Sequence, residues 1–400
     1  MDLPRIERGG AVLSEDNFPA VWLEVDLDGI SHNVQAIRQR LSPRTALMAI
    51  VKANGYGHGA VPVAKAALHQ GAQWLGLGSV EEAIYLRQAG ITAPMLVLGP
   101  PLKWQASLAV ENDLRVTVCT WDVARELSHA AKLRGVPVRV HVKIDTGMGR
   151  LGVMPGAALD FIKRLQTLPN LEVEGIFSHF ATADSPDHSY AQQQFSAFME
   201  VIHDLEQAEI DIPIKHMANT AAALALPKTQ LSLVRSGIAV YGLSTVEDPQ
   251  GLLDLVPALE LKVTVSFVHR VLAGSGVSYD AKYVVSEDTN IVTLPVGYAD
   301  GYSRLLSGKG EVLLQGKRYP LVGNICMGQC MADVGDDAIS VGDVAVLMGR
   351  QGHEYISAAD LAAKMGTIHY EVICMMGDKL PRFYRGQEAR RQGLLPGGIH

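Results

Sequence analysis

The feature that most constrains this fold is a regular alternation of short apolar segments with longer amphipathic ones between residues 22 and 243. The short segments have the length of strands and read WLEVDL, TALMAIVK, WLGLGS, PMLVLG, LRVTVC, VRVHVKI, LEVEGIFSH, IKHMAN and LSLVRSG. Between them lie stretches such as SVEEAIYLRQAG and TWDVARELSHAAKLRG, in which apolar residues recur three and four positions apart before a closing glycine. Alternating strands and helices predict a parallel sheet that is buried on both faces.

The number of strands favours one way of closing this sheet. Setting aside the first segment leaves eight strands, the number that closes a (β/α)8 barrel. An open, doubly wound sheet is the alternative, but no G-x-G-x-x-G sequence opens the first helix. We therefore expect an α/β protein whose residues 1–250 form a (β/α)8 TIM-type barrel with a short N-terminal arm.

The sequence changes character after residue 243. A linker-like stretch, STVEDPQGLLDLVPALE, is followed by apolar runs with turn residues at short spacing, including LKVTVSFVHRVLAG, NIVTLPVGYADG, EVLLQGKRYPLVGNICM and DVAVLMG. One helix is expected near residues 357–366, where Ser357 and Asp360 have the spacing of a capping box. Residues 251–400 are therefore predicted to form a second, predominantly β domain.

Composition narrows the class of protein. The net charge of −7 and the pI near 6.0 argue against a surface for nucleic acid or anionic membrane. No apolar run approaches the roughly 18 residues of a membrane span, and the first residues carry no apolar export signal. Four cysteines in 400 residues do not make a disulfide framework. We expect a cytoplasmic protein.

Polar side chains follow several predicted strands, where a barrel places its active site. A lone lysine such as Lys52 could simply be solvated, but five strand ends contribute polar groups to the same rim. These groups are Lys52, Lys143, Asp145, Arg150, His179, His216, Asn219, Thr220 and Arg235, followed by Gly237. This convergence favours a functional site.

The residue types at this rim suit pyridoxal phosphate. A lysine amine forms a Schiff base with a carbonyl compound, so Lys52 is the candidate nucleophile. The cofactor also needs a partner for its ring nitrogen and a cradle for its phosphate. Arg235 is the candidate for the nitrogen, and Thr220 with the SGIA turn is the candidate cradle.

These motifs resemble those of bacterial alanine racemases over nearly the whole chain. The segments AIVKANGYGHGA, WLEVDLDGISHNV, KIDTGMGRLG, SHFATAD, HMANTAAAL, VRSGIAVYGL, VSYDAKY, LPVGYADGY and TIHYEV occur in that family's order and spacing. The resemblance implies a barrel joined to a β domain, pyridoxal 5'-phosphate as the cofactor, and alanine as the substrate. It also implies a homodimer with composite active sites, which supplies D-alanine for peptidoglycan.

Residue roles follow from the same resemblance. Two acid–base groups flank the substrate: Lys52 handles the proton of the D-antipode, and Tyr279 that of the L-antipode. The implied cofactor-binding residues are Lys52, Tyr56, His179, Asn219, Thr220, Arg235, Gly237, Ile238 and Tyr370, and the implied substrate-binding residues are Arg150, Met327 and Tyr298. Arg150 and His179 are candidates for favouring the phenolate of Tyr279. Lys143 matches a lysine that is carbamylated in several relatives, where the carbamate holds the arginine matching Arg150.

Some positions depart from the family pattern and leave alternatives open. Gly328 stands where an aspartate is usual, Asn324 where an arginine is common, and Asp280 where a glycine is frequent. Serine or another small amino acid therefore remains an alternative substrate. More distant alternatives are a pyridoxal-dependent decarboxylase and a non-catalytic protein that buffers the cofactor. A metal site is not expected, because the C-x3-C spacing of Cys326 and Cys330 is not that of a zinc knuckle.

Overall fold

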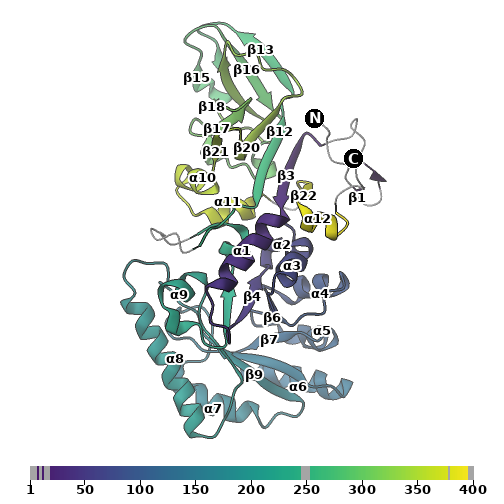
Figure 1. The fold of residues 1–400 in the computed structure, drawn as a ribbon, viewed down its shortest axis with the longest axis vertical. Coiled ribbons are helices and arrows are strands. Elements are labelled where there is room, and N and C mark those ends of the chain that lie inside the picture. Colours follow the sequence, from purple (N-terminus) through teal and green to yellow (C-terminus); the bar gives the residue numbers. More distant parts are fainter. Residues whose placement is uncertain (1–6, 9–10, 13–18, 245–252, 377–378, 395–400) are drawn as a thin grey trace. The chain divides into compact units, whose positions relative to one another are not determined.

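The structure is a computed structural model that describes residues 7–8, 11–12, 19–244, 253–376 and 379–394. The chain divides into two compact units (Figure 1). The described residues within 29–55 and 60–257 form the first, called the barrel unit, and those within 1–28, 56–59 and 258–400 form the second, called the β-rich unit. The predicted domain boundary between residues 250 and 251 lies outside the described residues. None of the helices in the described ranges is long and apolar enough to cross a membrane.

The barrel unit contains an eight-stranded sheet whose neighbouring strands are parallel. Its strands are β4 (Ala46–Ile50), β5 (Trp74–Leu77), β6 (Met95–Val97), β7 (Arg115–Val118), β8 (Val138–Lys143), β9 (Leu171–Phe177), β10 (Ile214–His216) and β11 (Leu233–Ser236). They pair in chain order, and β11 pairs with β4. A parallel bridge between Asn219 and Arg235 joins the two remaining edges, β10 and β11. The predicted barrel is confirmed.

Helices follow the strands and lie outside them in the barrel unit (Figure 1). They are α1 (Leu27–Gln39), α2 (Lys52–Tyr56), α3 (Ala60–His69), α4 (Val80–Gln88), α5 (Ala106–Glu111), α6 (Trp121–Arg134), α7 (Pro155–Leu165), α8 (Ser189–Gln207) and α9 (Thr220–Ala225), with a 3₁₀ turn η4 (Ile238–Tyr241) after β11. The two helical stretches singled out in the sequence form α4 and α6. Ser79 caps α4 by accepting the N–H of Glu82, and Gly135 ends α6 in the left-handed conformation that glycine favours.

The β-rich unit is built on a ten-stranded sheet, in the order β13-β16-β19-β18-β17-β20-β12-β3-β22 with β21 beside β20. Its strands are β3 (Val21–Asp26), β12 (Leu259–Thr264), β13 (Phe267–Val271), β16 (Thr289–Leu294), β17 (Glu311–Leu314), β18 (Lys317–Val322), β19 (Cys330–Gly335), β20 (Val344–Gln351), β21 (Glu354–Ile356) and β22 (Arg382–Arg385). A small hairpin joins β14 (Gly276–Val277) to β15 (Tyr283–Val284). Strand β3, the apolar segment that was set aside from the barrel, lies here between β12 and β22.

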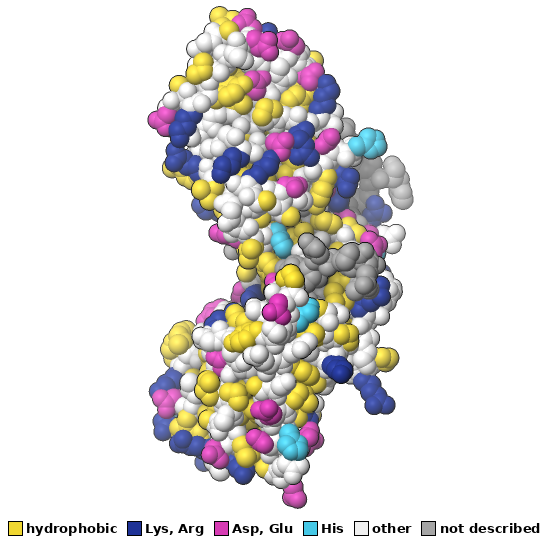
Figure 2. Space-filling view, turned by 90° about the vertical axis from the view of Figure 1, so that its left-hand side faces the viewer, with side chains coloured by type: hydrophobic (Ala, Val, Ile, Leu, Met, Phe, Trp, Pro, Cys, Tyr) yellow, Lys and Arg dark blue, Asp and Glu magenta, His cyan; other side chains and the backbone are white. Residues whose placement is uncertain are grey.

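The described part of the β-rich unit also contains the α-helices α10 (Ala358–Met365), α11 (His369–Met375) and α12 (Gln387–Arg391). The predicted capping box of α10 is confirmed. The Ser357 hydroxyl accepts the N–H of Asp360, and the Asp360 carboxylate accepts the N–H of Ser357, both at 2.9 Å. On the face that Figure 2 shows, basic and acidic side chains are interspersed in both units.

Candidate active site

Lys52 lies directly after β4 and opens an unusual turn. The next four residues all have left-handed backbone angles: φ is 51° at Ala53, 50° at Asn54, 60° at Gly55 and 49° at Tyr56. Such a conformation costs roughly 1–2 kcal/mol at each residue other than glycine. Backbone strain of this kind persists only where surrounding structure enforces it, and it concentrates at functional sites. The turn therefore marks Lys52 as a residue whose position is tightly set.

Side-chain hydrogen bonds enforce the turn after Lys52. The Glu82 carboxylate accepts the N–H of Ala53 and the N–H of Gly78, each at 2.7 Å, and so ties the turn to the end of β5. The Asn54 side-chain oxygen accepts the N–H of Ala60 at 2.8 Å. The Lys52 side chain itself is exposed, as a nucleophile must be to reach a ligand.

Arg235 lies near the carboxyl end of β11 and is only 4% exposed. Its Nη2 donates to the carbonyl oxygens of Ser178 and Met217, both at 2.8 Å, and lies 3.1 Å from Nδ1 of His179. Its Nη1 lies 2.9 Å from Nδ1 of His216. Since a guanidinium can only donate, both imidazole nitrogens that face it act as acceptors. Residues at the carboxyl ends of β9 and β10 thus hold the guanidinium that β11 contributes.

Electrostatic interactions show that the cationic side chains converge. Burial lowers the pKa of His179 well below its ordinary value, and four positive charges lower it further: those of Arg235, Lys143, Arg150 and Lys52. Burial, followed by the charge of Arg235, lowers the pKa of Lys143 to about 7. Burial, with Arg150 nearby, lowers the pKa of Arg235 to about 9. The rim therefore carries a cluster of cationic side chains suited to an anionic ligand.

Two short helices begin beside Arg235 and offer further anion-binding groups. Helix α9 begins at Thr220, with Asn219 as its N-cap, and η4 begins at Ile238, directly after Gly237. The hydroxyl oxygens of Thr220 and Ser236 lie 2.8 Å apart. The first N–H groups of a helix have no partner within it, so such starts bind anions readily. Hydroxyls and backbone N–H groups thus meet at one end of the barrel.

The β-rich unit brings a second group of predicted residues together. Asn324 Nδ2 donates to the carbonyl oxygen of Tyr279 at 2.9 Å, and the N–H of Tyr298 donates to the carbonyl oxygen of Cys326 at 3.2 Å. These bonds connect three loops, so that Tyr279, Tyr298 and Met327 belong to one loop cluster. Their side chains are 68%, 44% and 62% exposed. Tyr279 also borders a cavity of about 480 Å³.

The departures from the family pattern lie in this same loop cluster. Asn324 Nδ2 lies 3.4 Å from the carboxylate of Asp280, so these two departures contact each other. Asp280 has a φ of 63°, which explains why glycine suits this position. A Cβ atom added at Gly328 would meet no atom within 4 Å. Position 328 therefore has room for a larger side chain.

Tyr56 and Tyr370 are the remaining predicted cofactor residues, and both belong to the β-rich unit. Their ring centroids lie 6.0 Å apart with the planes tilted by 50°. This contact places the two rings side by side within the β-rich unit, and their role toward the cofactor's phosphate stays a prediction.

Several residues that shape the rim were not predicted. Glu82 holds the turn at Lys52, Ser178 accepts from Arg235, and Phe177 stacks on His216 with 4.8 Å between ring centroids. His141, inside the VRVHVK strand, is fully buried in the barrel. Its signal in the sequence was a polar residue in the middle of a strand that the parallel-sheet prediction buries on both faces.

Comparison with known proteins identifies the family. Residues 25–245 match the family described as alanine racemase, N-terminal domain, and residues 258–384 match alanine racemase, C-terminal domain. The alanine racemase of Desulfovibrio desulfuricans is 44% identical over 365 residues, covering 91% of this chain and 98% of that protein.

Solved structures agree with this assignment. Alanine racemase from Clostridium difficile 630 superposes with a TM-score of 0.88 at 36% identity, covering 93% of this chain and 97% of that one. Alanine racemase from Bacillus anthracis with bound L-Ala-P superposes with a TM-score of 0.87 at 39% identity, covering 93% and 96%. Because the two family matches together span both units, the chain belongs to the alanine racemase family.

Proposed function

We propose that this protein is a pyridoxal 5'-phosphate-dependent racemase that interconverts L- and D-alanine. The observation that carries this proposal is the pairing, at one barrel rim, of an exposed lysine on a strained turn with a buried arginine. Family membership supplies the reaction, since the relatives are alanine racemases. A cytoplasmic location, and a role in supplying D-alanine for peptidoglycan, are part of the same proposal.

The residues at the rim fit the proposed cofactor. Lys52 offers an amine for its aldehyde, and Arg235 offers an N–H donor for its ring nitrogen. Thr220, Ser236 and the starts of α9 and η4 offer hydroxyls and N–H groups for its phosphate. When bound, pyridoxal phosphate supplies an electron sink for the pair that the Cα–H bond leaves behind.

Arginine as the partner of the ring nitrogen suits racemisation. A carboxylate at this position would favour a protonated nitrogen and a strong electron sink. Arg235 remains charged at neutral pH and can only donate, so it would hold the cofactor's ring nitrogen in its unprotonated form. A weaker electron sink of this kind would limit side reactions such as transamination, so that the bases of this protein would only have to move one proton.

Racemisation needs a proton removed from one face of Cα and a proton returned on the other. We assign one face to the amine of Lys52 and the other to the phenol of Tyr279 of the partner subunit, in a homodimer with composite sites. The exposed Tyr279, Tyr298 and Met327 side chains support this assignment, because side chains that reach another chain's site must project from their own. Arg150, Met327 and Tyr298 are the proposed contacts to the substrate.

Lys143 is proposed to carry a carbamate. It is 3% exposed, and burial, with the charge of Arg235, lowers its pKa to about 7, so much of it is the neutral amine that reacts with carbon dioxide. The resulting anion would compensate the positive charges of the rim, among them Arg150. A mass increase of one CO2 on Lys143 in the native protein supports this proposal, and an unmodified lysine in bicarbonate buffer contradicts it.

The activity is tested by incubating L- and D-alanine separately with the cofactor-loaded protein in deuterated water. We expect both to reach the racemic mixture and to gain deuterium at Cα, because enantiomers have equal free energy. Faster turnover of serine than of alanine would identify the alternative substrate. Release of carbon dioxide would indicate a decarboxylase, and binding without turnover would indicate a cofactor-buffering protein.

Two variants separate the proposed bases. Lys52→Ala should abolish the absorbance band near 420 nm (about where a lysine–pyridoxal Schiff base absorbs) together with all turnover. Tyr279→Phe should keep that band and lose deuterium exchange into L-alanine. Retention of full racemase activity by Tyr279→Phe would refute the two-base assignment.

A further inference from the structure

A chain of polar side chains runs through the interior of the barrel and ends at Arg235. Nε2 of His141 lies 3.2 Å from the Glu174 carboxylate, and Nδ1 of His141 lies 2.9 Å from Nε2 of His216. Nδ1 of His216 lies 2.9 Å from Nη1 of Arg235. Both histidines are fully buried, so water does not compete for these contacts. The chain links β9, β8, β10 and β11 in a single path.

The two ends of this chain fix the direction of every hydrogen bond. Arg235 can only donate and the Glu174 carboxylate can only accept. Nδ1 of His216 must therefore accept, which places its proton on Nε2, and this N–H donates to Nδ1 of His141. His141 then carries its own proton on Nε2 and donates it to Glu174. One arrangement satisfies all three contacts, and in it both imidazoles are neutral.

Protonation of either imidazole would break this row of hydrogen bonds. A proton added at Nδ1 of His141 would point at the N–H of His216, and a proton added at Nδ1 of His216 would point at Arg235. The electrostatics agree with this, since burial lowers the pKa of His141 and lowers that of His216 well below its ordinary value. The hydrogen bond and the charge of Glu174 raise the pKa of His141, but the effect of burial is larger and the pKa is lowered overall.

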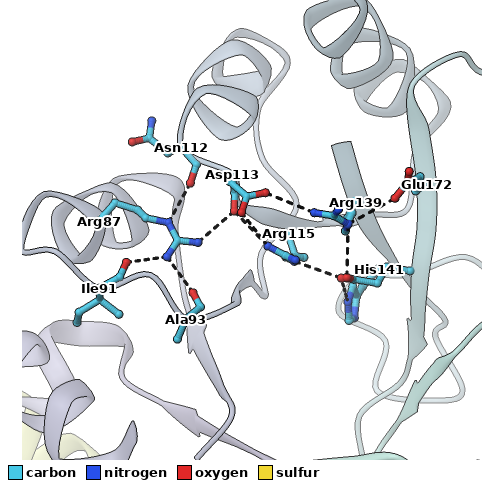
Figure 3. A network of polar contacts seen from close by, with 10 residues as sticks. Arg87, Ile91, Ala93, Asn112, Asp113, Arg115, Arg139, His141 and Glu172 are labelled. Carbon is cyan, nitrogen blue, oxygen red and sulfur yellow. Dashed lines mark hydrogen bonds and ion pairs between the residues drawn. The ribbon is translucent and has the colours of Figure 1, made fainter. Parts of the chain in front are cut away.

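The outer end of the chain is held by two arginines. Arg115 Nε lies 3.3 Å from the Glu174 carboxylate and Arg139 Nε lies 3.8 Å from it, and Arg115 also lies over the ring of Trp74. Figure 3 shows these arginines beside His141. Burial alone would raise the pKa of Glu174, but the hydrogen bond from His141 and the charge of Arg115 outweigh it and lower that pKa. Glu174 is therefore an ionised carboxylate.

We propose that Glu174 is a positioning residue for the racemase reaction, acting through His141 and His216 to hold Arg235 charged and aimed as a donor to the cofactor's ring nitrogen. This inference rests on the proposed function. A carboxylate beside the nitrogen would favour its protonation, whereas one placed two neutral rings away compensates the buried guanidinium from a distance. Phe177 supports the alignment, since its ring stacks on His216 and lies 5.4 Å from the Arg235 guanidinium.

The first test follows the imidazole protons by ¹⁵N NMR in the protein prepared without cofactor. We expect both His141 and His216 to be neutral and protonated on Nε2. Glu174→Leu removes the terminal acceptor and should change the tautomer or the exchange rate of His141. Glu174→Gln keeps an oxygen acceptor and should preserve the tautomers. Doubly protonated rings in the wild-type protein, or signals that Glu174→Leu leaves unchanged, would overturn the proposal.

The second test uses the cofactor-loaded enzyme and a matched control. Glu172 lies on the same strand and pairs with Arg139 at 3.4 Å but is 55% exposed. Glu174→Gln should lower kcat about tenfold with little change in KM, as for the loss of one charge-assisted interaction, and should shift the ¹⁵N resonance of the labelled ring nitrogen. Glu172→Gln should change neither.

The outcomes separate this proposal from the proposed function. Equal kcat values and ring-nitrogen resonances for the Glu174→Gln and Glu172→Gln enzymes would overturn the role of Glu174 while leaving the racemase intact. A wild-type protein without racemase activity would refute the proposed function, and the tautomers measured without cofactor would still decide whether the chain of hydrogen bonds exists. Circular dichroism and thermal unfolding of each variant confirm that it is folded.

Discussion

Two buried candidate residues of the barrel unit and two exposed ones of the β-rich unit are held in opposite ways. In the barrel unit, Arg235 and Lys143 are 4% and 3% exposed, and the Arg235 side chain is bonded to carbonyl groups and imidazoles of neighbouring strands. In the β-rich unit, Tyr279 and Met327 are 68% and 62% exposed, and hydrogen bonds of their backbone groups fix their loops. The first arrangement fixes side chains, whereas the second fixes only the backbone from which they project.

This difference decides whether a substitution changes the stability of the protein as well as its activity. A buried charged group that satisfies several backbone carbonyls cannot be removed without leaving those carbonyls unpaired. An exposed side chain on an anchored loop contributes little to the folded state and is available to act on another chain. We therefore expect substitution of Arg235 to lower both stability and activity, and substitutions of the exposed loop side chains to lower activity alone.

The largest effect is expected for Arg235→Met. Loss of the guanidinium leaves the carbonyl oxygens of Ser178 and Met217 buried without their donor, and we expect the free energy of unfolding to fall by about 3–5 kcal/mol. Tyr279→Phe should change it by less than about 0.5 kcal/mol. Urea denaturation of both variants, each compared with the wild type, measures the contrast. Equal losses would mean that the two units do not differ in the way described.

A smaller effect is expected where two loops of the β-rich unit meet. A Cβ atom added at Gly297 would lie 2.2 Å from the carbonyl oxygen of Cys326 and 2.5 Å from that of Met327, so Gly297→Ala must displace one of the loops. We expect a loss of about 1–3 kcal/mol together with lower kcat/KM. Gly328→Ala is the matched control, since its Cβ would meet no atom within 4 Å. A stable, fully active Gly297→Ala protein would show that backbone anchoring does not position this loop cluster.

The pH dependence of stability tests the buried lysine of the barrel. Lys143 has a pKa of about 7 in the folded protein and 10.5 as its ordinary value, so between these limits the unfolded chain binds one more proton than the folded one. Lys143 therefore lowers stability at pH 7 and below, and this cost is relieved as the pH rises toward 10.5. In carbonate-free buffer, the free energy of unfolding of the wild type relative to Lys143→Met should rise by about 1 kcal/mol between pH 8 and pH 9. A flat difference would refute a neutral Lys143.

The sequence predicted the helices and strands of both units. This was possible because the pattern of apolar residues within a segment indicates which of its faces is buried, whatever the rest of the chain does. It also placed Lys52, His179, Asn219, Thr220 and Arg235 together, since parallel strands in a barrel share one carboxyl end. It did not reveal that β3 joins the sheet of the β-rich unit, because the apolar pattern of a strand does not indicate which other strands it pairs with.

The polar interior of the barrel was also beyond the reach of sequence patterns. His141 and Glu174 lie 33 residues apart, and His141 and His216 lie 75 apart, so no spacing rule connects them. The strained turn after Lys52 was not predicted from the sequence for a related reason. Ala53 is a poor candidate for a left-handed conformation, and it takes one because Glu82, from α4, binds its N–H.

The smallest expected effect comes from relaxing that turn. Ala53→Gly removes a strain of roughly 1–2 kcal/mol and adds about 0.5–1 kcal/mol of chain entropy to the unfolded state, so the protein should become about 0.5 kcal/mol more stable. The same change at Ala363, exposed in the right-handed helix α10, should instead cost about 1 kcal/mol. We expect Ala53→Gly to lower kcat although it raises stability, because a looser turn positions Lys52 less firmly. A variant at position 53 that is destabilised as much as Ala363→Gly would show that the left-handed turn is not strained.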